Sequence, residues 1–272
     1  MVSIYYINLA SRPDRREFME HQLASLGLVG TRIEAATPDD LTAEELALYC
    51  NSEKPKYLRP RELACTMSHE RAWAAMLANG DERALILEDD AELSSMLPGL
   101  LAELDGIDID ILRLEATGRR LRLLPKVQTT SGGVDLHPFR STPMGAAGYI
   151  VNARAAKALL GHPAFRVLQT DLVLYNPFEA PAKSLSRLQT LPGMVCQLGQ
   201  EHPVMRSVGK SDIAHVEERH AFKFKHPVQF RWIRFRDGVI DGYRNARDHF
   251  ANRKNGLFRK AIPFAGADGQ GR

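Results

Sequence analysis

Three adjacent carboxylates, Glu88, Asp89 and Asp90, directly follow the apolar run Ala84–Leu87. An apolar run of this length between polar neighbours predicts a central strand buried on both faces, with the acids at its carboxyl end. Neighbouring carboxylates repel one another unless a cation or hydrogen-bond donors stabilise them. Side chains alternate along an extended segment, which would put Glu88 and Asp90 on one side and Asp89 on the other. Because Mg²⁺ and Mn²⁺ prefer oxygen ligands, we predict that these acids bind a divalent metal, which could lie on either side; alternatively, the acids only stabilise the start of the next helix.

A second polar cluster lies where the apolar segment 2–9 ends. It comprises Asn8, Arg12, Asp14, Arg15 and Arg16. Pro13 is typical of the first turn of a helix, and the backbone N–H groups of a helix start favour anions. Arginine side chains bind phosphates through two parallel hydrogen bonds. The cluster therefore predicts a phosphate site, although a solvated helix start has the same composition.

Ser68 and His69 form a third candidate site, in a predicted helix that also carries Cys65 and Trp73. A histidine near a tryptophan on a helix is either a ligand contact or a packed residue with locally bonded nitrogens. The pair does not predict a serine hydrolase, because adjacent helical residues do not face each other and the chain lacks the G-x-S-x-G motif.

Strand and helix patterns alternate along the chain. Apolar or β-branched runs predict strands at residues 2–9, 31–35, 84–87, 109–114 and 146–151. Helical spacing and capping signals predict helices at residues 14–28, 42–50, 61–79, 96–104 and 153–160. Such alternation predicts an α/β sandwich with a mostly parallel central sheet, whose binding site lies at the carboxyl ends of the strands. The polar stretch 51–60 is predicted to be a mobile surface loop that could cover a ligand.

The composition of 272 residues, 44% hydrophobic and 25% charged, is enough for one large domain with its own core. The formal charge is only +3, but residues 201–272 hold 15 basic and 8 acidic side chains. We predict a catalytic domain over residues 1–200 and a basic, partly flexible extension over residues 201–272. Residues 219–260 mix aromatic side chains with 12 Lys and Arg, which suits an anionic membrane surface, a solvated helix face or RNA. No nucleic-acid motif is present in the sequence, so we do not expect nucleic acid as a partner.

Cys50, Cys65 and Cys196 are odd in number and lack metal-ligand spacing, which predicts neither a disulfide framework nor a zinc site. No run approaches the roughly 20 apolar residues that cross a bilayer. The amino terminus lacks the basic leader and apolar core of a signal peptide. We therefore expect a cytoplasmic protein that could touch the inner face of a membrane at its periphery.

Three segments in register resemble glycosyltransferase family 25, the lipooligosaccharide galactosyltransferase-like enzymes. They are Tyr6–Arg15, Glu62–Trp73 and Leu85–Ala91, and a later block over residues 148–160, followed by Asp171, extends the likeness to residues 2–175. The resemblance implies a GT-A-like, Rossmann-type fold, a divalent metal and a UDP-sugar donor, most often UDP-galactose or UDP-glucose. It also implies inverting transfer to a hydroxyl of a cell-surface glycan such as lipooligosaccharide.

Carried over by position, the resemblance gives each of the three clusters a role. Asn8, Leu9, Arg12 and Arg15 would border the nucleotide, Ser68, His69 and Asp89 would lie near the donor, and Glu88 with Asp90 would form the metal-binding motif. The motif reads Glu-Asp-Asp rather than Asp-x-Asp, so the resemblance does not single out the carboxylate that contacts the metal.

Inverting transfer needs a carboxylate base that takes the proton of the acceptor. Asp171 is the first candidate, because it is a single acid that emerges from the stretch 167–171 after a predicted helix; a helix-capping aspartate is the alternative. Glu115, which ends the predicted strand 109–114, is the second candidate. Two other functions stay open: a catalytically silent GT-A-like module that holds a polyanion or partner through its basic surface, and metal-dependent nucleotidyl or phosphoryl transfer. The absence of G-x-x-x-x-G-K-[ST] argues only against the P-loop form of the latter.

Overall fold

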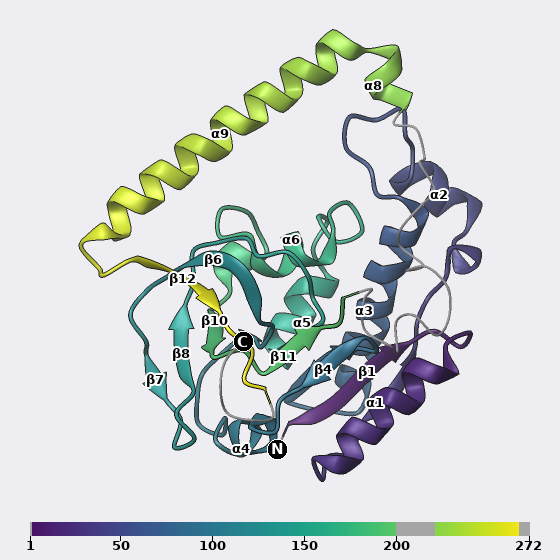
Figure 1. Cartoon of the computed structure of the whole chain (residues 1–272). Coiled ribbons are helices and arrows are strands. Elements are labelled where there is room, and N and C mark those ends of the chain that lie inside the picture. Colours follow the sequence, from purple (N-terminus) through teal and green to yellow (C-terminus); the bar gives the residue numbers. More distant parts are fainter. Residues whose placement is uncertain (1, 200–220, 267–272) are drawn as a thin grey trace.

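The sheet at the centre of the molecule has eight strands in the order β2-β1-β3-β9-β5-β10-β8-β7 (Figure 1). The computed structural model describes residues 2–199 and 221–266. The strands are β1 (Ser3–Asn8), β2 (Thr31–Glu34), β3 (Arg83–Glu88), β5 (Ile111–Arg113), β7 (Gln128–Thr129), β8 (Asp135–Pro138), β9 (Gly148–Asn152) and β10 (Arg187–Leu191). The helices around them are α1 (Pro13–Ser25), α2 (Ala43–Tyr49), α3 (Pro60–Ala78), α4 (Leu97–Ala102), α5 (Ala153–Leu160) and α6 (Thr170–Tyr175).

Most strands of this sheet run in one direction. β1 is parallel to β2 and β3, and β5 is parallel to β10. β9 lies between β3 and β5 and is antiparallel to both, so β3 and β5 share one direction. At the far edge, β8 is antiparallel to β10 and to β7. The predicted α/β sandwich with a mostly parallel sheet is therefore confirmed.

Alternate residues of β1 and β3 enter two separate cores, one on each face of the sheet. Tyr5 and Ile86 belong to the core under α3, α5 and α6, whereas Tyr6 and Leu85 belong to the core under α1 and α4. All four residues of the run Ala84–Leu87 are 0% exposed, as a strand buried on both faces requires.

The register of β1 and β3 places their carboxyl ends side by side. Ile7 of β1 lies opposite Glu88 of β3, and Asn8 lies opposite Glu34 of β2. Because the three strands are parallel, the polar residues that follow them collect at one edge of the sheet.

The chain after β10 returns to the body of the molecule in two small sheets. β11 (Val195–Gln197) pairs with β4 (Ala91–Leu93), and β12 (Phe258–Ile262) pairs with β6 (Thr117–Leu123). Between them lie α8 (Ala221–Lys225) and the long helix α9 (Pro227–Arg253), which was not among the predicted helices. The predicted extension 201–272 also includes residues 201–220 and 267–272, which lie outside the described residues.

None of the helices in the described ranges is long and apolar enough to cross a membrane. Cys50, Cys65 and Cys196 are not joined by disulfide bonds.

Candidate active site

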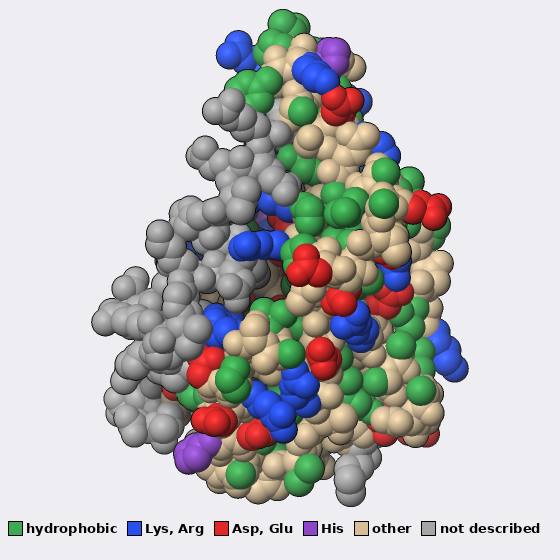
Figure 2. Space-filling view, turned by 90° about the vertical axis from the view of Figure 1, so that its right-hand side faces the viewer, with side chains coloured by type: hydrophobic (Ala, Val, Ile, Leu, Met, Phe, Trp, Pro, Cys, Tyr) green, Lys and Arg blue, Asp and Glu red, His purple; other side chains and the backbone are tan. Residues whose placement is uncertain are grey.

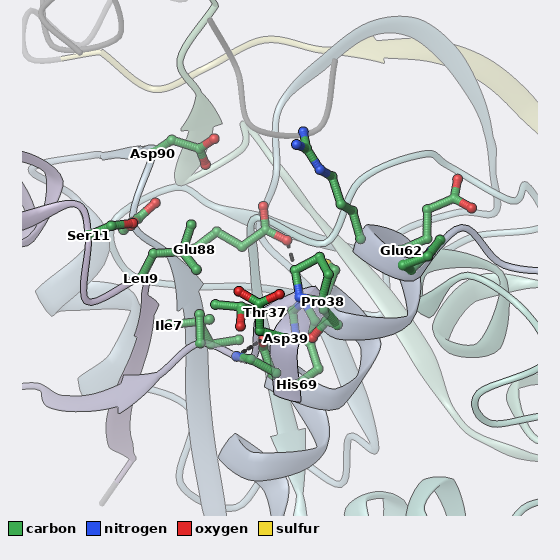
Figure 3. Close-up of a pocket in the computed structure, with 18 of the residues that line it drawn as sticks. Ile7, Leu9, Ser11, Thr37, Pro38, Asp39, Glu62, His69, Glu88 and Asp90 are labelled. Atoms are coloured by element: carbon green, nitrogen blue, oxygen red, sulfur yellow. Dashed lines mark hydrogen bonds and ion pairs between the residues drawn. The ribbon is translucent and has the colours of Figure 1, made fainter. Parts of the chain in front are cut away.

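A cavity of ≈ 640 Å³ opens where β1, β2 and β3 end, beside the start of α3 (Figure 3). Residues 35–39, which follow β2, and residues 59–62, at the start of α3, form much of its wall. The predicted site residues that line it are Leu9, Arg15, Ser68, His69, Glu88, Asp89 and Asp90. The sheet edge predicted from the strand pattern is therefore the place where most candidate residues gather.

The three consecutive acids all line this cavity. β3 ends at Glu88, and Asp89 and Asp90 form the turn into β4. Because the extended backbone stops at Glu88, the strict alternation predicted for the three side chains does not hold. Asn8 Nδ2 donates to Asp89 Oδ2 at 2.7 Å. Arg15 Nη1 lies 3.1 Å from Asp89 Oδ1 and 3.8 Å from Asp90 Oδ2, so one guanidinium faces two carboxylates.

Of the three acids, Asp90 is the one with a buried carboxylate oxygen that no described residue hydrogen-bonds. Gln197 Nε2 donates to its Oδ2 at 3.4 Å, while its Oδ1 is buried and has no hydrogen-bond partner among the described residues. Burial and the charges of Glu88 and Asp89 raise the pKa of Asp90 to about 7, and Arg15 opposes this shift only in part. A cation is what would stabilise a buried, unpartnered carboxylate oxygen beside further carboxylates. The residues present therefore fit a hard divalent ion such as Mg²⁺ or Mn²⁺, with Glu88 and Asp90 as its ligands.

Glu88 also belongs to a second group of potential metal ligands, together with Cys65 and His69. Cys65 Sγ, a His69 ring nitrogen and a Glu88 carboxylate oxygen lie within 4.8 Å of one another. Burial, followed by the charge of Glu88 and more distant acids, raises the pKa of the Cys65 thiol, so the thiol stays protonated at neutral pH. Only the thiolate is a good metal ligand, and Mg²⁺ and Mn²⁺ prefer oxygen. The carboxylates of Glu88 and Asp90 are thus the better cation ligands.

His69 is buried and holds the Glu88 carboxylate through a chain of hydrogen bonds. Its Nε2 lies 3.3 Å from Glu88 Oε1, and its Nδ1 lies 2.9 Å from Tyr149 Oη. Tyr149 Oη also accepts a hydrogen bond from Trp73 Nε1 at 2.8 Å. Because Trp73 Nε1 donates to Tyr149 Oη, the hydroxyl proton of Tyr149 is free to be donated to His69 Nδ1. The ring proton of His69 then lies on Nε2, which faces Glu88. His69 is therefore a packed residue and a cavity contact at once.

Ser68 connects α3 to the cavity wall after β2. Its Oγ accepts a hydrogen bond from Ala36 N–H at 2.8 Å and donates to Ala64 O at 2.8 Å. Because both hydrogen-bonding roles of the hydroxyl are in use, Ser68 holds residues 35–39 against α3.

Asn8 and Arg12 are buried and do not line the cavity within the described part of the chain. Arg12 Nε and Nη2 donate to the Asp14 carboxylate at 3.0 and 2.9 Å. Asn8 Nδ2 donates to Arg12 O at 3.0 Å as well as to Asp89. Both residues thus shape the turn after β1 and position Asp89, and their direct contact with a nucleotide stays a prediction.

Glu115 and Asp171, the two candidate bases, meet at one short segment before β9. Ala147 N–H donates to Glu115 Oε2 at 3.1 Å, and Gly145 N–H donates to Asp171 Oδ2 at 3.1 Å. Ala147 O accepts a hydrogen bond from Glu88 N–H at 3.0 Å. The segment therefore brings Glu88, at the end of β3, and Glu115, just after β5, close to the acid of α6, although neither candidate base is among the described residues that line the cavity.

The two candidate bases differ in how their carboxylates are used. Glu115 is 6% exposed, and its Oε1 lies 3.1 Å from Arg113 Nη2. Burial raises the pKa of Glu115 to about 7, while Arg113 opposes the shift. Asp171 is half-buried in the first turn of α6, where Leu172 N–H donates to its Oδ1 at 2.8 Å. Burial raises the pKa of Asp171 too, against the N–H donors of Gly145 and Leu172.

Arginines at the start of α3 were not predicted for the site. Arg59 and Arg61 flank Pro60, and all three line the cavity. The same Arg-Pro pair opens α1 at residues 12–13, so its repetition was a signal that could have identified them. Residues 35–39 carry no such motif, and their place in the wall follows from the pairing of β2 with β1.

Residues 1–174 match the model of glycosyltransferase family 25, which is described as LPS biosynthesis protein. The chain belongs to this family. A Haemophilus influenzae protein, named provisionally as a glycosyltransferase, is 30% identical over 185 residues, which are 66% of this chain and 61% of that protein. Lipooligosaccharide biosynthesis protein lic2B from Haemophilus influenzae is 27% identical over 214 residues, or 73% of this chain and 77% of that protein.

Family 25 also includes a human relative named inactive glycosyltransferase 25 family member 3. It is 27% identical over 191 residues, which are 65% of this chain and 31% of that protein. Among solved structures, a glycosyltransferase involved in the glycosylation of the major capsid of PBCV-1 matches 72% of this chain and 92% of its own, with a TM-score of 0.41 and 10% identity. The match of residues 1–174 to the family model confirms the family resemblance predicted from the sequence.

Proposed function

We propose that this family 25 chain is a metal-dependent hexosyltransferase. It transfers galactose or glucose from a UDP-sugar to a hydroxyl of a cell-surface glycan such as lipooligosaccharide, with inversion at the anomeric carbon. The family description and the name of the relative lic2B support an acceptor of the lipopolysaccharide class.

The main support for the proposal is a pair of buried atoms, one from an acidic and one from a basic residue that line the same cavity. Asp90 Oδ1 and Arg15 Nε are buried, and neither has a hydrogen-bond partner within residues 2–199 and 221–266. The carboxylate oxygen lacks a positive partner, and the guanidinium N–H lacks an acceptor. A diphosphate bound with a divalent cation supplies both, since the cation neutralises the carboxylate and a phosphate oxygen accepts from the arginine.

The cavity also has a basic side that suits a diphosphate. Figure 3 shows Glu88 between Asp90 on one side and Glu62, at the start of α3, on the other. Arg59 and Arg61 line the cavity at that start of α3, a helix of 19 residues whose amino end favours anions. The acidic side can therefore hold the cation while the start of α3 attracts the phosphates.

A bound Mg²⁺ or Mn²⁺ would neutralise the charge that develops on the leaving diphosphate. The residues that would hold it are Glu88 and Asp90. His69 keeps Glu88 oriented through its Nε2 proton, and Arg15 keeps Asp90 in place beside Asp89.

Asp171 is the proposed base. The acceptor oxygen forms a bond to the anomeric carbon, the bond from that carbon to the diphosphate oxygen breaks with its electron pair, and the hydroxyl proton passes to the Asp171 carboxylate. Burial raises the pKa of Asp171, which makes it a stronger base than an exposed aspartate. Glu115 is less suited, because it is only 6% exposed and Arg113 pairs with its carboxylate, whereas Asp171 is half-buried and accepts hydrogen bonds from uncharged backbone groups.

The test measures sugar transfer and nucleotide release from UDP-, GDP- and CMP-sugars to an oligosaccharide acceptor, with Mn²⁺ or with EDTA. We expect turnover of a UDP-sugar only when the metal is present. Asp171→Asn should retain donor binding, measured by thermal shift, and lose about 10²–10⁴-fold in transfer rate. The exposed control Asp108→Asn should retain both.

Three outcomes would change the assignment. Near-normal transfer by Asp171→Asn would move the role of the base to Glu115. Equal turnover in EDTA would remove the metal. If the protein turns over no sugar nucleotide but binds a polyanion in a salt-sensitive way, with or without donor, it is instead a catalytically silent module.

A further inference from the structure

The long helix α9 is held along one side of the molecule by ion pairs (Figure 1). Asp237, in its first half, lies 3.1 Å from Lys56. Asp248, near its carboxyl end, is buried and lies 2.5 Å from Arg140. These contacts fix which face of α9 points toward the body and which points into solvent.

The two faces of α9 differ in composition. The buried or half-buried residues of α9 are Phe230, Ile233, Asp237, Arg244, Asp248 and Asn252. On the other face lie apolar residues that are 55–80% exposed, here called the exposed stripe: Val228, Trp232, Phe235, Val239, Tyr243 and Phe250. Their spacing of three, four or seven residues aligns all of them on one side of the helix. An apolar surface of this kind on a soluble body marks an interaction site.

Charge is also distributed unequally around α9. Its acids share the face toward the body, at spacings of four and seven residues: Asp237, Asp241 and Asp248. Exposed arginines lie three or four residues from members of the exposed stripe and border it: Arg231, Arg236 and Arg247. Arg236 also pairs with Asp237 at 2.8 Å, so Arg231 and Arg247 contribute most of the positive charge that borders the stripe.

We propose that the exposed stripe of α9 docks onto the surface of an anionic phospholipid bilayer. Its apolar side chains enter the boundary between headgroups and acyl chains, and the bordering arginines meet the lipid phosphates. Trp232 and Tyr243 suit this depth, because their rings are apolar with one polar edge. Figure 2 shows hydrophobic and basic side chains next to one another at the tip of the molecule, where α8 and the start of α9 lie.

The charge pattern favours lipid over two other occupants. A second copy of the chain, paired stripe to stripe, would bring two sets of arginines together at the same contact. RNA binding relies on phosphate contacts and aromatic stacking, which would leave Val228 and Val239 without a function.

The docked helix is connected to the candidate active site. Phe222 N–H of α8 donates to Ser52 O at 2.9 Å, and Lys56 pairs with Asp237 of α9. The loop that contains Ser52 and Lys56 leads into Arg59 and the cavity wall. Docking would therefore hold the start of α3 near the lipid surface; if the proposed function holds, a lipid-linked acceptor would be presented there.

Tryptophan fluorescence tests the docking, since of the two tryptophans Trp232 is 62% exposed and Trp73 is 0% exposed. The full-length protein is mixed with vesicles of phosphatidylcholine, alone or with phosphatidylglycerol, in the absence of nucleotide and metal. We expect a blue shift of the emission with the anionic vesicles only, and none in Trp232→Ser. No shift in the wild type, or an equal shift with both kinds of vesicle, would overturn the proposal.

Co-sedimentation with the same vesicles separates the apolar contribution from the charge contribution. Phe235→Ser should bind roughly tenfold more weakly, and Arg247→Gln about fivefold more weakly. The control Val127→Ser, which changes a residue that is 62% exposed outside α9, should bind like the wild type. Circular dichroism verifies that each variant is folded.

Three further results would overturn the proposal. In the first, Phe235→Ser binds vesicles as tightly as the wild type does. In the second, the wild type is a dimer that Phe235→Ser dissociates. In the third, RNA binds the protein and competes with the vesicles. Vesicle binding needs no donor, so Asp90→Asn should bind vesicles like the wild type. A failure of docking is thereby distinguished from a failure of the proposed function.

Discussion

Replacing Tyr149 by Phe removes one oxygen atom and takes the hydrogen-bond partner from two buried groups. Trp73 Nε1 loses its acceptor at 2.8 Å, and His69 Nδ1 loses its partner at 2.9 Å. Each buried polar group left without a partner costs about 1–3 kcal/mol, so the free energy of unfolding should fall by roughly 2–6 kcal/mol.

Tyr175→Phe is the matched control for this substitution. Tyr175 is as fully buried as Tyr149, but its hydroxyl has no hydrogen-bond partner in the part of the chain that the structure describes. Removing that hydroxyl should leave stability unchanged or raise it by up to about 1 kcal/mol. Both variants lose the same atom, so their difference reports the hydrogen bonds alone.

Equilibrium unfolding in urea, followed by circular dichroism, measures both variants against the wild type. Burial raises the pKa of Tyr149 well above its ordinary value, so the hydroxyl is protonated at the neutral pH of the measurement. Thermal shift with UDP should show weaker binding by Tyr149→Phe only, because His69 would no longer be held against Glu88. Unfolding free energies of Tyr149→Phe and Tyr175→Phe that agree within about 0.5 kcal/mol would refute the hydrogen-bond chain.

Three more perturbations test the backbone and the charges of the site and of the turn after β1. Gly145→Ala should lower stability and transfer more than Gly133→Ala: both glycines have a positive φ, of 88° and 81°, but a Cβ at Gly145 would lie 2.6 Å from a buried carboxylate oxygen, whereas a Cβ at Gly133 would meet no described atom within 4 Å. Equal losses in urea unfolding would contradict the close packing at Gly145. In EDTA, Asp90→Asn should raise the free energy of unfolding by up to about 4 kcal/mol at about pH 8. The pKa of Asp90 is raised from 3.8 to about 7, so the folded chain holds the proton more tightly and loses stability as the pH rises between those values. This gain in the free energy of unfolding should vanish near pH 4. A gain that does not change with pH would show that the charge of Asp90 is not its cause. Asp14→Asn should behave in the opposite way and lose stability at neutral pH but not in acid, because hydrogen bonds from a neighbouring arginine lower the pKa of Asp14.

The strands that position the site could be predicted because the local pattern of apolar residues indicates which segments are buried. The run Ala84–Leu87 has no polar residue, which is typical of a strand covered on both faces. The acids after it mark the end of that strand, so the edge of the sheet that holds the cavity followed directly.

The direction of β9 and the course of α9 could not be predicted in this way. The apolar pattern of β9 is the same for either direction, and its antiparallel pairing with β3 and β5 is set by contacts far along the chain. The apolar residues of α9 do follow helical spacing, but Gly238 and Gly242 lower the helix propensity, and the stripe faces solvent rather than a core.

Within the site, the residue types were predicted better than their orientations. The predicted alternation of Glu88, Asp89 and Asp90 was wrong because β3 stops at Glu88. The contacts of Tyr149 with His69 and Trp73 join residues that are 80 and 76 positions apart, a separation at which local pattern carries no information. The grouping of Glu115 and Asp171 around residues 145–147 depends on tertiary packing of the same kind.

Calorimetric titration of UDP, with Mn²⁺ and with EDTA, into the wild type and Asp90→Asn tests most directly whether the acids after β3 bind a cation and, with it, a diphosphate. We predict that Mn²⁺ tightens UDP binding roughly tenfold or more in the wild type and has little effect in Asp90→Asn. Equal affinities of the wild type for UDP in Mn²⁺ and in EDTA would contradict the proposed site.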